Sequence, residues 1–201
     1  MRSHFEEIRQ IELALLFGDL DTARFHARAL ATMPQGVGEA ELQPISLARV
    51  REVALRVASA DAVEAALPLV ADLAGECGRC HQASSASVRI PQVAEPGEDG
   101  SLASRMERHQ WAADRIWEGL VTPSRERWQE GLVVLGEAPL PPDGVTDDRS
   151  LYPAIERLGR QLAVQAMAAR DATAGDGQTR TFGAMLKVCS ACHVLIRGRS
   201  E

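Results

Sequence analysis

Cysteine and histidine occur together in two short segments of the chain, in the same order and at the same spacing. Residues 77–81 read Cys-Gly-Arg-Cys-His, and residues 189–193 read Cys-Ser-Ala-Cys-His. These two segments contain every cysteine of the 201-residue sequence. The pattern C-x-x-C-H is typical of covalent haem attachment, in which two thiols form thioethers with the porphyrin and the histidine binds the iron.

The sequence therefore predicts two haem c groups. The spacing suits a helix, because the first and fourth positions share a helix face and both sulfurs can then reach one edge of the ring. The residues predicted to hold the first haem are Cys77, Cys80 and the iron ligand His81, and those predicted for the second are Cys189, Cys192 and the iron ligand His193.

Other uses of the cysteines stay open at this point. A single zinc ion could bind all four thiolates, but Cys77 and Cys189 are 112 positions apart and the two matched histidines would have no role. A redox dithiol of the thioredoxin kind needs a βαβ context, which the sequence does not offer. The remaining alternative is two buried cysteine pairs with incidental histidines.

The sequence also repeats itself with an offset of 105 positions. The pattern Met-x-x-His occurs at residues 1–4 and again at 106–109. The same offset pairs apolar residues with apolar residues, a helix breaker with a helix breaker, and one helix N-cap residue with another. These pairs include Ile11 and Ile116, Leu15 and Leu120, Gly18 and Pro123, Asp19 and Ser124, and Leu30 and Leu135. The second half has seven extra residues before its C-x-x-C-H motif, and we place them in the loop 137–144.

The repeat supplies candidates for a second ligand to each iron. In an antiparallel four-helix bundle, the start of the first helix and the end of the fourth lie at the same end. The matched histidines His4 and His109 are therefore predicted to face His81 and His193. Met106 competes with His109, and an open haem with an apolar distal side is the third alternative. Two protein ligands favour electron transfer, whereas an open iron binds small gases or peroxide.

Hydrophobic periodicity predicts four helices in each half. In the first half they cover about 2–17, 19–32, a segment after Pro44, and a last helix that begins near Asp61 or Pro68. In the second half they cover about 102–120, 124–136, 149–172 and 176–197. Frequent alanine and leucine, with only 4 % aromatic residues, favour helices over strands.

A segment rich in Ser, Pro, Glu and Gly, residues 84–100, predicts a linker between the halves. We therefore expect an all-α protein of two tandem four-helix bundles, formed by residues 1–95 and 96–201. A bundle of this size buries a modest core, and a covalent cofactor would stabilise it.

The end of the chain adds a family resemblance. Residues 182–193, Phe-Gly-Ala-Met-Leu-Lys-Val-Cys-Ser-Ala-Cys-His, followed by Arg197, resemble the cytochrome c′ family of four-helix bundles with C-x-x-C-H near the end of the last helix. The resemblance covers each half separately and implies a tandem, dihaem form of that fold. It also implies that oligomers can form through the first two helices. The family has an apolar distal residue and a five-coordinate iron, so His4 and His109 depart from its pattern and resemble its low-spin relatives.

The motifs and the resemblance together predict a dihaem c-type cytochrome that carries electrons between redox partner proteins and is not an enzyme. Two alternatives are a gas- or nitric-oxide-binding protein with an open haem, and a dihaem peroxidase. The formal charge of −6, with both signs mixed along the chain, shows no basic nucleic-acid footprint. No apolar run approaches the ~20 residues that span a membrane.

Covalent haem attachment of this kind takes place outside the bacterial cytoplasmic membrane, so the sequence predicts a periplasmic protein. The residues after Met1 are Arg-Ser-His-Phe-Glu-Glu and contain no apolar segment. We therefore expect that a secretory signal was removed.

Overall fold

The computed structural model describes residues 2–33, 44–84, 88, 90–137, 141–171 and 175–197. Within these ranges the chain forms eight α-helices and two short 3-10 turns, with no β-strand. The prediction of an all-α protein is confirmed. The helices are α1 Arg2–Leu16, α2 Leu20–Thr32, α3 Pro44–Ala58, α4 Val63–Ala83, α5 Leu102–Val121, α6 Arg125–Leu135, α7 Tyr152–Ala169 and α8 Asp176–Arg197, and the 3-10 turns are Pro142–Gly144 and Arg149–Leu151.

The ends of α1, α2 and α6 follow from local residue types. Gly18 has a φ of 79°, a left-handed conformation that glycine adopts at little cost, and it terminates α1. Asp19 then caps α2, because its carboxylate accepts a hydrogen bond from the backbone N–H of Thr22 at 2.9 Å. Ser124 caps α6 in the same way through the N–H of Arg127. Both N-caps were predicted from the repeat.

The fourth and seventh helices differ in detail from the prediction. α4 begins at Val63, between the two predicted starts, and Pro68 lies inside it. Proline removes one backbone hydrogen bond of a helix interior. The helix predicted over 149–172 is a 3-10 turn at Arg149–Leu151 followed by α7. The described residues of the predicted linker, 84, 88 and 90–100, form no helix.

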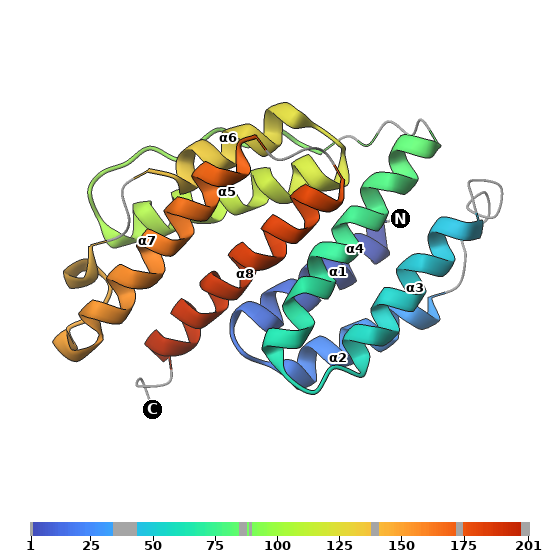
Figure 1. The fold of residues 1–201 in the computed structure, drawn as a ribbon, viewed down its shortest axis with the longest axis horizontal. Coiled ribbons are helices and arrows are strands. Elements are labelled where there is room, and N and C mark those ends of the chain that lie inside the picture. The colour runs from blue at the N-terminus through green and yellow to red at the C-terminus, as the bar shows by residue number, and fades with distance from the viewer. Residues whose placement is uncertain are drawn as a thin grey trace.

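The two halves of the chain lie side by side, with α4 and α8 next to each other in the middle (Figure 1). These two helices run antiparallel, since Gly75 of α4 lies against Thr179 and Gly183 of α8 lies against Pro68. α4 also packs against α5, and α8 packs against α1. The last helix of each half therefore contacts the first helix of the other half.

One continuous core joins the halves. Buried apolar side chains from all eight helices form a single cluster. Its members include the repeat pairs Ile11 and Ile116, Leu15 and Leu120, and Leu30 and Leu135, together with Trp117 and Trp128. The division into two tandem four-helix bundles with a boundary near residue 95 stays a prediction.

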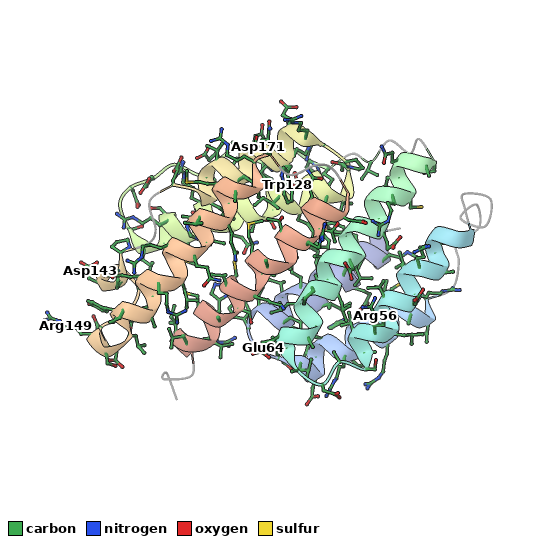
Figure 2. The ribbon with its side chains drawn as sticks, in the orientation of Figure 1. Arg56, Glu64, Trp128, Asp143, Arg149 and Asp171 are labelled. Atoms are coloured by element: carbon green, nitrogen blue, oxygen red, sulfur yellow. The ribbon has the colours of Figure 1, made fainter. Side chains whose placement is uncertain are left out.

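Many charged side chains lie on the outside of this core. Figure 2 shows Glu64, Asp143 and Arg149 at the periphery of the molecule, and all three are exposed. In the part of the chain that the structure describes, no helix combines the length and the apolar character needed to cross a bilayer.

Candidate functional site

The first C-x-x-C-H motif lies in the last turns of α4, where this helix meets the end of α5. Its two cysteines are half-buried and form no disulfide. Nδ1 of His81 lies 2.7 Å from the carbonyl oxygen of Val121. A carbonyl only accepts hydrogen bonds, so Nδ1 is the donor in this contact. In the neutral form of the ring, this tautomer leaves the lone pair on Nε2. Histidines that bind metals are oriented in this way by a carbonyl on their second nitrogen.

The close approach of α4 to α5 depends on the residue after the first cysteine. A Cβ at Gly78 would fall on the carbonyl oxygen of Leu120, well inside van der Waals contact. Glycine at this position therefore lets the motif lie directly on the last turn of α5. That contact brings His81 to the carbonyl of Val121.

The second motif lies in the last turns of α8, where this helix meets the end of α1. Ser190, the counterpart of Gly78, donates a hydrogen bond from Oγ to the carbonyl oxygen of Leu15 at 2.9 Å. The ring of His193 stacks on Phe17, with 5.1 Å between the ring centroids. Burial lowers the pKa of His193, the carbonyl of Leu16 partly offsets this, and Arg197 lowers the pKa further. Nδ1 of His193 is buried without a hydrogen-bond partner among the described residues.

The two motifs thus occupy equivalent places in the repeat. Leu15 and Leu120 are 105 positions apart, and so are Leu16 and Val121. In each case the motif of one half packs against the last turn of the first helix of the other half. The repeat predicts each motif inside its own bundle. The contact of each motif with the first helix of the other half has no local sign in the sequence.

The structure gives partial information on the predicted second ligands. Burial lowers the pKa of His109, and the charges of Arg108 and His193 lower it further, so His109 lies within electrostatic range of His193. A lowered pKa keeps an imidazole neutral, which is the form that binds a metal. Met106, one turn earlier on α5, is half-buried. His4 is half-buried at the start of α1, and its pairing with His81 stays a prediction.

The surroundings of the cysteines disfavour a redox dithiol and a zinc tetrathiolate, two of the alternatives for these residues. Burial raises the pKa of Cys77 and of Cys189 to about 12, whereas redox dithiols depend on a lowered thiol pKa. The antiparallel packing of α4 and α8 places the two cysteine pairs at opposite ends of this helix pair. Across the described residues, which include all four cysteines, no three His, Cys, Asp or Glu side chains gather around one point. The four thiols are therefore not arranged as one zinc tetrathiolate.

Comparisons with family models, with curated proteins and with solved structures find no match to this chain. The geometry of the two motifs and of their surroundings is therefore the basis on which a function can be proposed.

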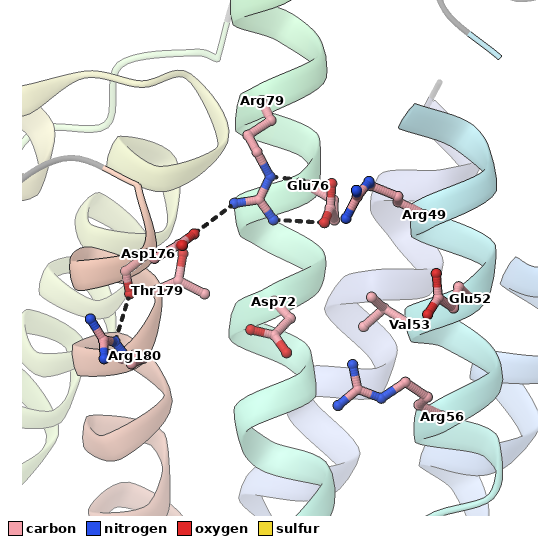
Figure 3. Close-up of a pocket in the computed structure, with 10 residues that line it drawn as sticks. All are labelled: Arg49, Glu52, Val53, Arg56, Asp72, Glu76, Arg79, Asp176, Thr179 and Arg180. Atoms are coloured by element: carbon pink, nitrogen blue, oxygen red, sulfur yellow. Dashed lines mark hydrogen bonds and ion pairs between the residues drawn. The ribbon is translucent and has the colours of Figure 1, made fainter. Parts of the chain in front are cut away.

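An ion pair distinguishes the first motif from the second. Figure 3 shows Glu76, directly before Cys77, bonded to Arg79, and Arg79 bonded in turn to Asp176 at the start of α8. These side chains line a groove of about 460 Å³ between α3, α4 and α8. Four arginines and four carboxylates line this groove, so their formal charges cancel. The second motif has Val188 and Ala191 in the places of Glu76 and Arg79.

A buried carboxylate that the sequence analysis missed lies near the second motif. Glu12 of α1 is 3 % exposed, and Nη1 of Arg9 lies 2.5 Å from its Oε2. Nη2 of the same arginine lies 2.5 Å from Asp114 of α5. Burial raises the pKa of Glu12 to about 7, Arg9 lowers it and Asp114 raises it further. The available signal was its position four residues after the buried Ile8, beside the apolar stripe of α1.

Proposed function

We propose that this protein is a dihaem c-type cytochrome that carries electrons. Cys77 and Cys80 would hold one haem and Cys189 and Cys192 the other, with His81 and His193 as iron ligands. The observation that carries the proposal is the bond from Nδ1 of His81 to the carbonyl of Val121. The second motif also bonds to the last turn of the first helix of the other half, through Ser190 and the carbonyl of Leu15. Two C-x-x-C-H motifs that use every cysteine support the same conclusion.

The residues around both motifs fit a covalent haem. The thiols of each pair lie on one helix at the required spacing and are free of disulfide bonds. Both iron-binding histidines are half-buried, and backbone carbonyls of Val121 and Leu16 act on their rings. Haem c, when bound, supplies a one-electron couple whose potential depends on its axial ligands and surroundings.

We propose His109 and His4 as the second ligands of the two haems. The electrostatic proximity of His109 to His193 supports this assignment in the second site. The repeat extends it to His4 and His81 in the first site. Two histidine ligands would keep each iron low-spin, which suits electron transfer, and would leave no open position for gases or peroxide.

The separation of the motifs supports two independent one-electron sites. Because α4 and α8 run antiparallel, His81 is level with the start of α8. That level is roughly 20 residues before His193, so at 1.5 Å per residue the two histidines are roughly 30 Å apart along the helix axis. Electron tunnelling falls off exponentially with distance, so attachment points this far apart favour separate electron exchange with redox partner proteins. This arrangement favours a carrier over a dihaem enzyme such as a peroxidase.

The remaining parts of the proposal follow from the chemistry of the motifs. Thioether attachment takes place outside the cytoplasmic membrane, so we propose a periplasmic location. We also propose that each half forms a four-helix bundle around its haem, as in the cytochrome c′ family. The exchanged contacts of α4 with α5 and of α8 with α1 would join the two bundles.

The haem content of paired serine variants tests this function. The chain would be produced in a bacterial periplasm that contains the haem attachment machinery, and covalent haem would be counted by intact-protein mass spectrometry. We expect two haems in the wild type, and one each in C77S/C80S and in C189S/C192S. Wild-type protein that folds under these conditions without covalent haem would contradict the proposal.

A further inference from the structure

The junction of α1, α5 and α8 contains the buried carboxylate Glu12. Arg9 is the cation bonded to it, and this arginine is shared with Asp114. The guanidinium of Arg9 also lies over the ring of Trp117, at 5.8 Å from the ring centroid. One cation therefore serves two carboxylates, so the junction has one negative charge more than it has positive charges when both carboxylates are ionised.

Glu12 is also close to the second motif. Burial is the main cause of the raised pKa of Cys189, and the negative charge of Glu12 raises it further, so the carboxylate and this sulfur lie within electrostatic range. Glu12 lies one turn before Leu15 and Leu16, whose carbonyls act on Ser190 and His193. A change of charge at the second site would therefore act on Glu12 through a buried, weakly screened path.

The first motif has no such group at the equivalent place. The residue 105 positions after Glu12 is Trp117, which is 1 % exposed and does not titrate in the physiological range. Two buried carboxylates lie near the first motif, and both are paired with arginines. Glu76 is paired with Arg79 of the same helix at 2.7 Å. Glu118, one turn before Val121, is paired with Arg115 and Arg127. The two sites thus share a backbone frame but differ in the residue one turn before the carbonyls that contact the motif.

We propose that Glu12 is a proton-binding site that couples proton uptake to electron uptake at the second motif. This inference rests on the proposed function. One electron from a one-electron donor protein enters the second site, and one proton from water forms an O–H bond with a carboxylate oxygen of Glu12. The buried junction then keeps its net charge, and both particles leave again on oxidation. By thermodynamic linkage, protonation of Glu12 raises the equilibrium constant for reduction by a certain factor, and reduction raises the equilibrium constant for protonation by the same factor.

The charged groups around Glu12 are consistent with this role. Arg9 on α1 and Asp114 on α5 are the charges that act on it, and the described residues of α2, α4 and α8 add no further charged side chain. Cys189 on α8 would be an uncharged thioether in the loaded protein. Asp114 accepts hydrogen bonds from Arg9 and from Gln110, and it is 39 % exposed, so water screens it more than Glu12. The pKa of about 7 places the protonation change of Glu12 near neutral pH.

Potentiometric titration of the dihaem protein between pH 5 and pH 9 tests this inference. We expect two one-electron waves. Around neutrality, the reduction equilibrium of one of them should fall tenfold per pH unit, which lowers its reduction potential by about 59 mV. E12Q should flatten this wave and leave the other unchanged. E12D, which restores a carboxyl group, should restore part of the slope. E6Q, on an exposed position of the same helix, should leave both waves as in the wild type.

A second readout does not depend on the variants. The reduced-minus-oxidised infrared difference spectrum of the wild type should show the carbonyl band of a protonated carboxyl group, shifted in D₂O. Two waves with the same pH dependence in E12Q and wild type, or the absence of this band, would overturn the inference. Protein that lacks haem would instead contradict the proposed function, so the two failures are distinguishable.

Discussion

The two C-x-x-C-H motifs share one backbone frame but have different electrostatic surroundings. Each motif lies on the last turn of the first helix of the opposite half. His81 is near the carbonyl of Val121 and His193 is near the carbonyl of Leu16, and these two carbonyls are 105 positions apart in the sequence. The first motif contains its own ion pair, Glu76–Arg79, whereas the second is apolar at those positions and has Glu12 nearby. The histidine thus has the same position in both halves of the repeat, while the charged side chains around it differ. We expect two haems with the same ligands and different potentials.

The largest expected effect concerns the ligands that the two sites have in common. H109A should open the second iron and make about half of the haem bind carbon monoxide, as a half-site change in the visible spectrum. H4A should do the same at the first site. H26A is the matched control, because His26 is bonded to Glu7 and has no repeat partner. Unchanged carbon monoxide binding in H109A would remove this histidine as a ligand.

A smaller effect tests the close packing of the first motif. G78A should lower the free energy of unfolding by about 3 kcal/mol, because its methyl group would collide with the carbonyl of Leu120 and the backbone must shift. Denaturant unfolding of the loaded protein measures this change. G97A is the control, since a Cβ at that position has no atom within 4 Å apart from its own chain neighbours. Equal stabilities of the two variants would contradict the packing of α4 on α5.

The pH dependence of stability tests Glu12. Its pKa is raised from 4.5 to about 7 in the folded protein, so the folded state binds more protons than the unfolded state between these values. Its contribution to stability is therefore complete below pH 4.5 and is lost as the pH rises to about 7, by about 3 kcal/mol. Unfolding of wild type and E12Q at pH 5 and pH 8 measures the difference. A wild-type pH dependence equal to that of E12Q would show that Glu12 does not titrate in this range.

The smallest effect concerns the second motif. S190A removes the hydrogen bond from Oγ to the carbonyl of Leu15 and should cost about 1 kcal/mol of unfolding free energy. This loss is smaller than the loss expected for G78A at the equivalent position, because S190A removes an oxygen atom whereas G78A adds a methyl group. A larger loss in S190A than in G78A, by the same denaturant measurement, would reverse the comparison.

Much of the fold could be predicted because it depends on local signals. The N-caps Asp19 and Ser124 and the apolar spacing of Ile8, Ile11 and Leu15 fix helix ends and buried faces. Periodicity indicates which face of a helix is buried, but not which helix covers it. For this reason the contact from Ser190 to Leu15, 175 positions apart, could not be predicted.

The candidate site was predicted unevenly for the same reason. The cysteines and histidines follow from a motif whose spacing is set by haem chemistry. The buried state of Glu12 depends on Arg9, Asp114 and the packing of three helices. A carboxylate beside an apolar stripe was the only local sign of it, and its charge state depends on tertiary burial.

The visible absorption spectrum of the protein matured with its haems tests the central claim most directly. It would be recorded oxidised and reduced, with and without carbon monoxide. The account predicts the sharp bands of low-spin c-type haem, at two haems per chain, unmoved by carbon monoxide. High-spin bands that shift with carbon monoxide would contradict the ligands His4 and His109, and a folded protein without haem absorbance would contradict the function itself.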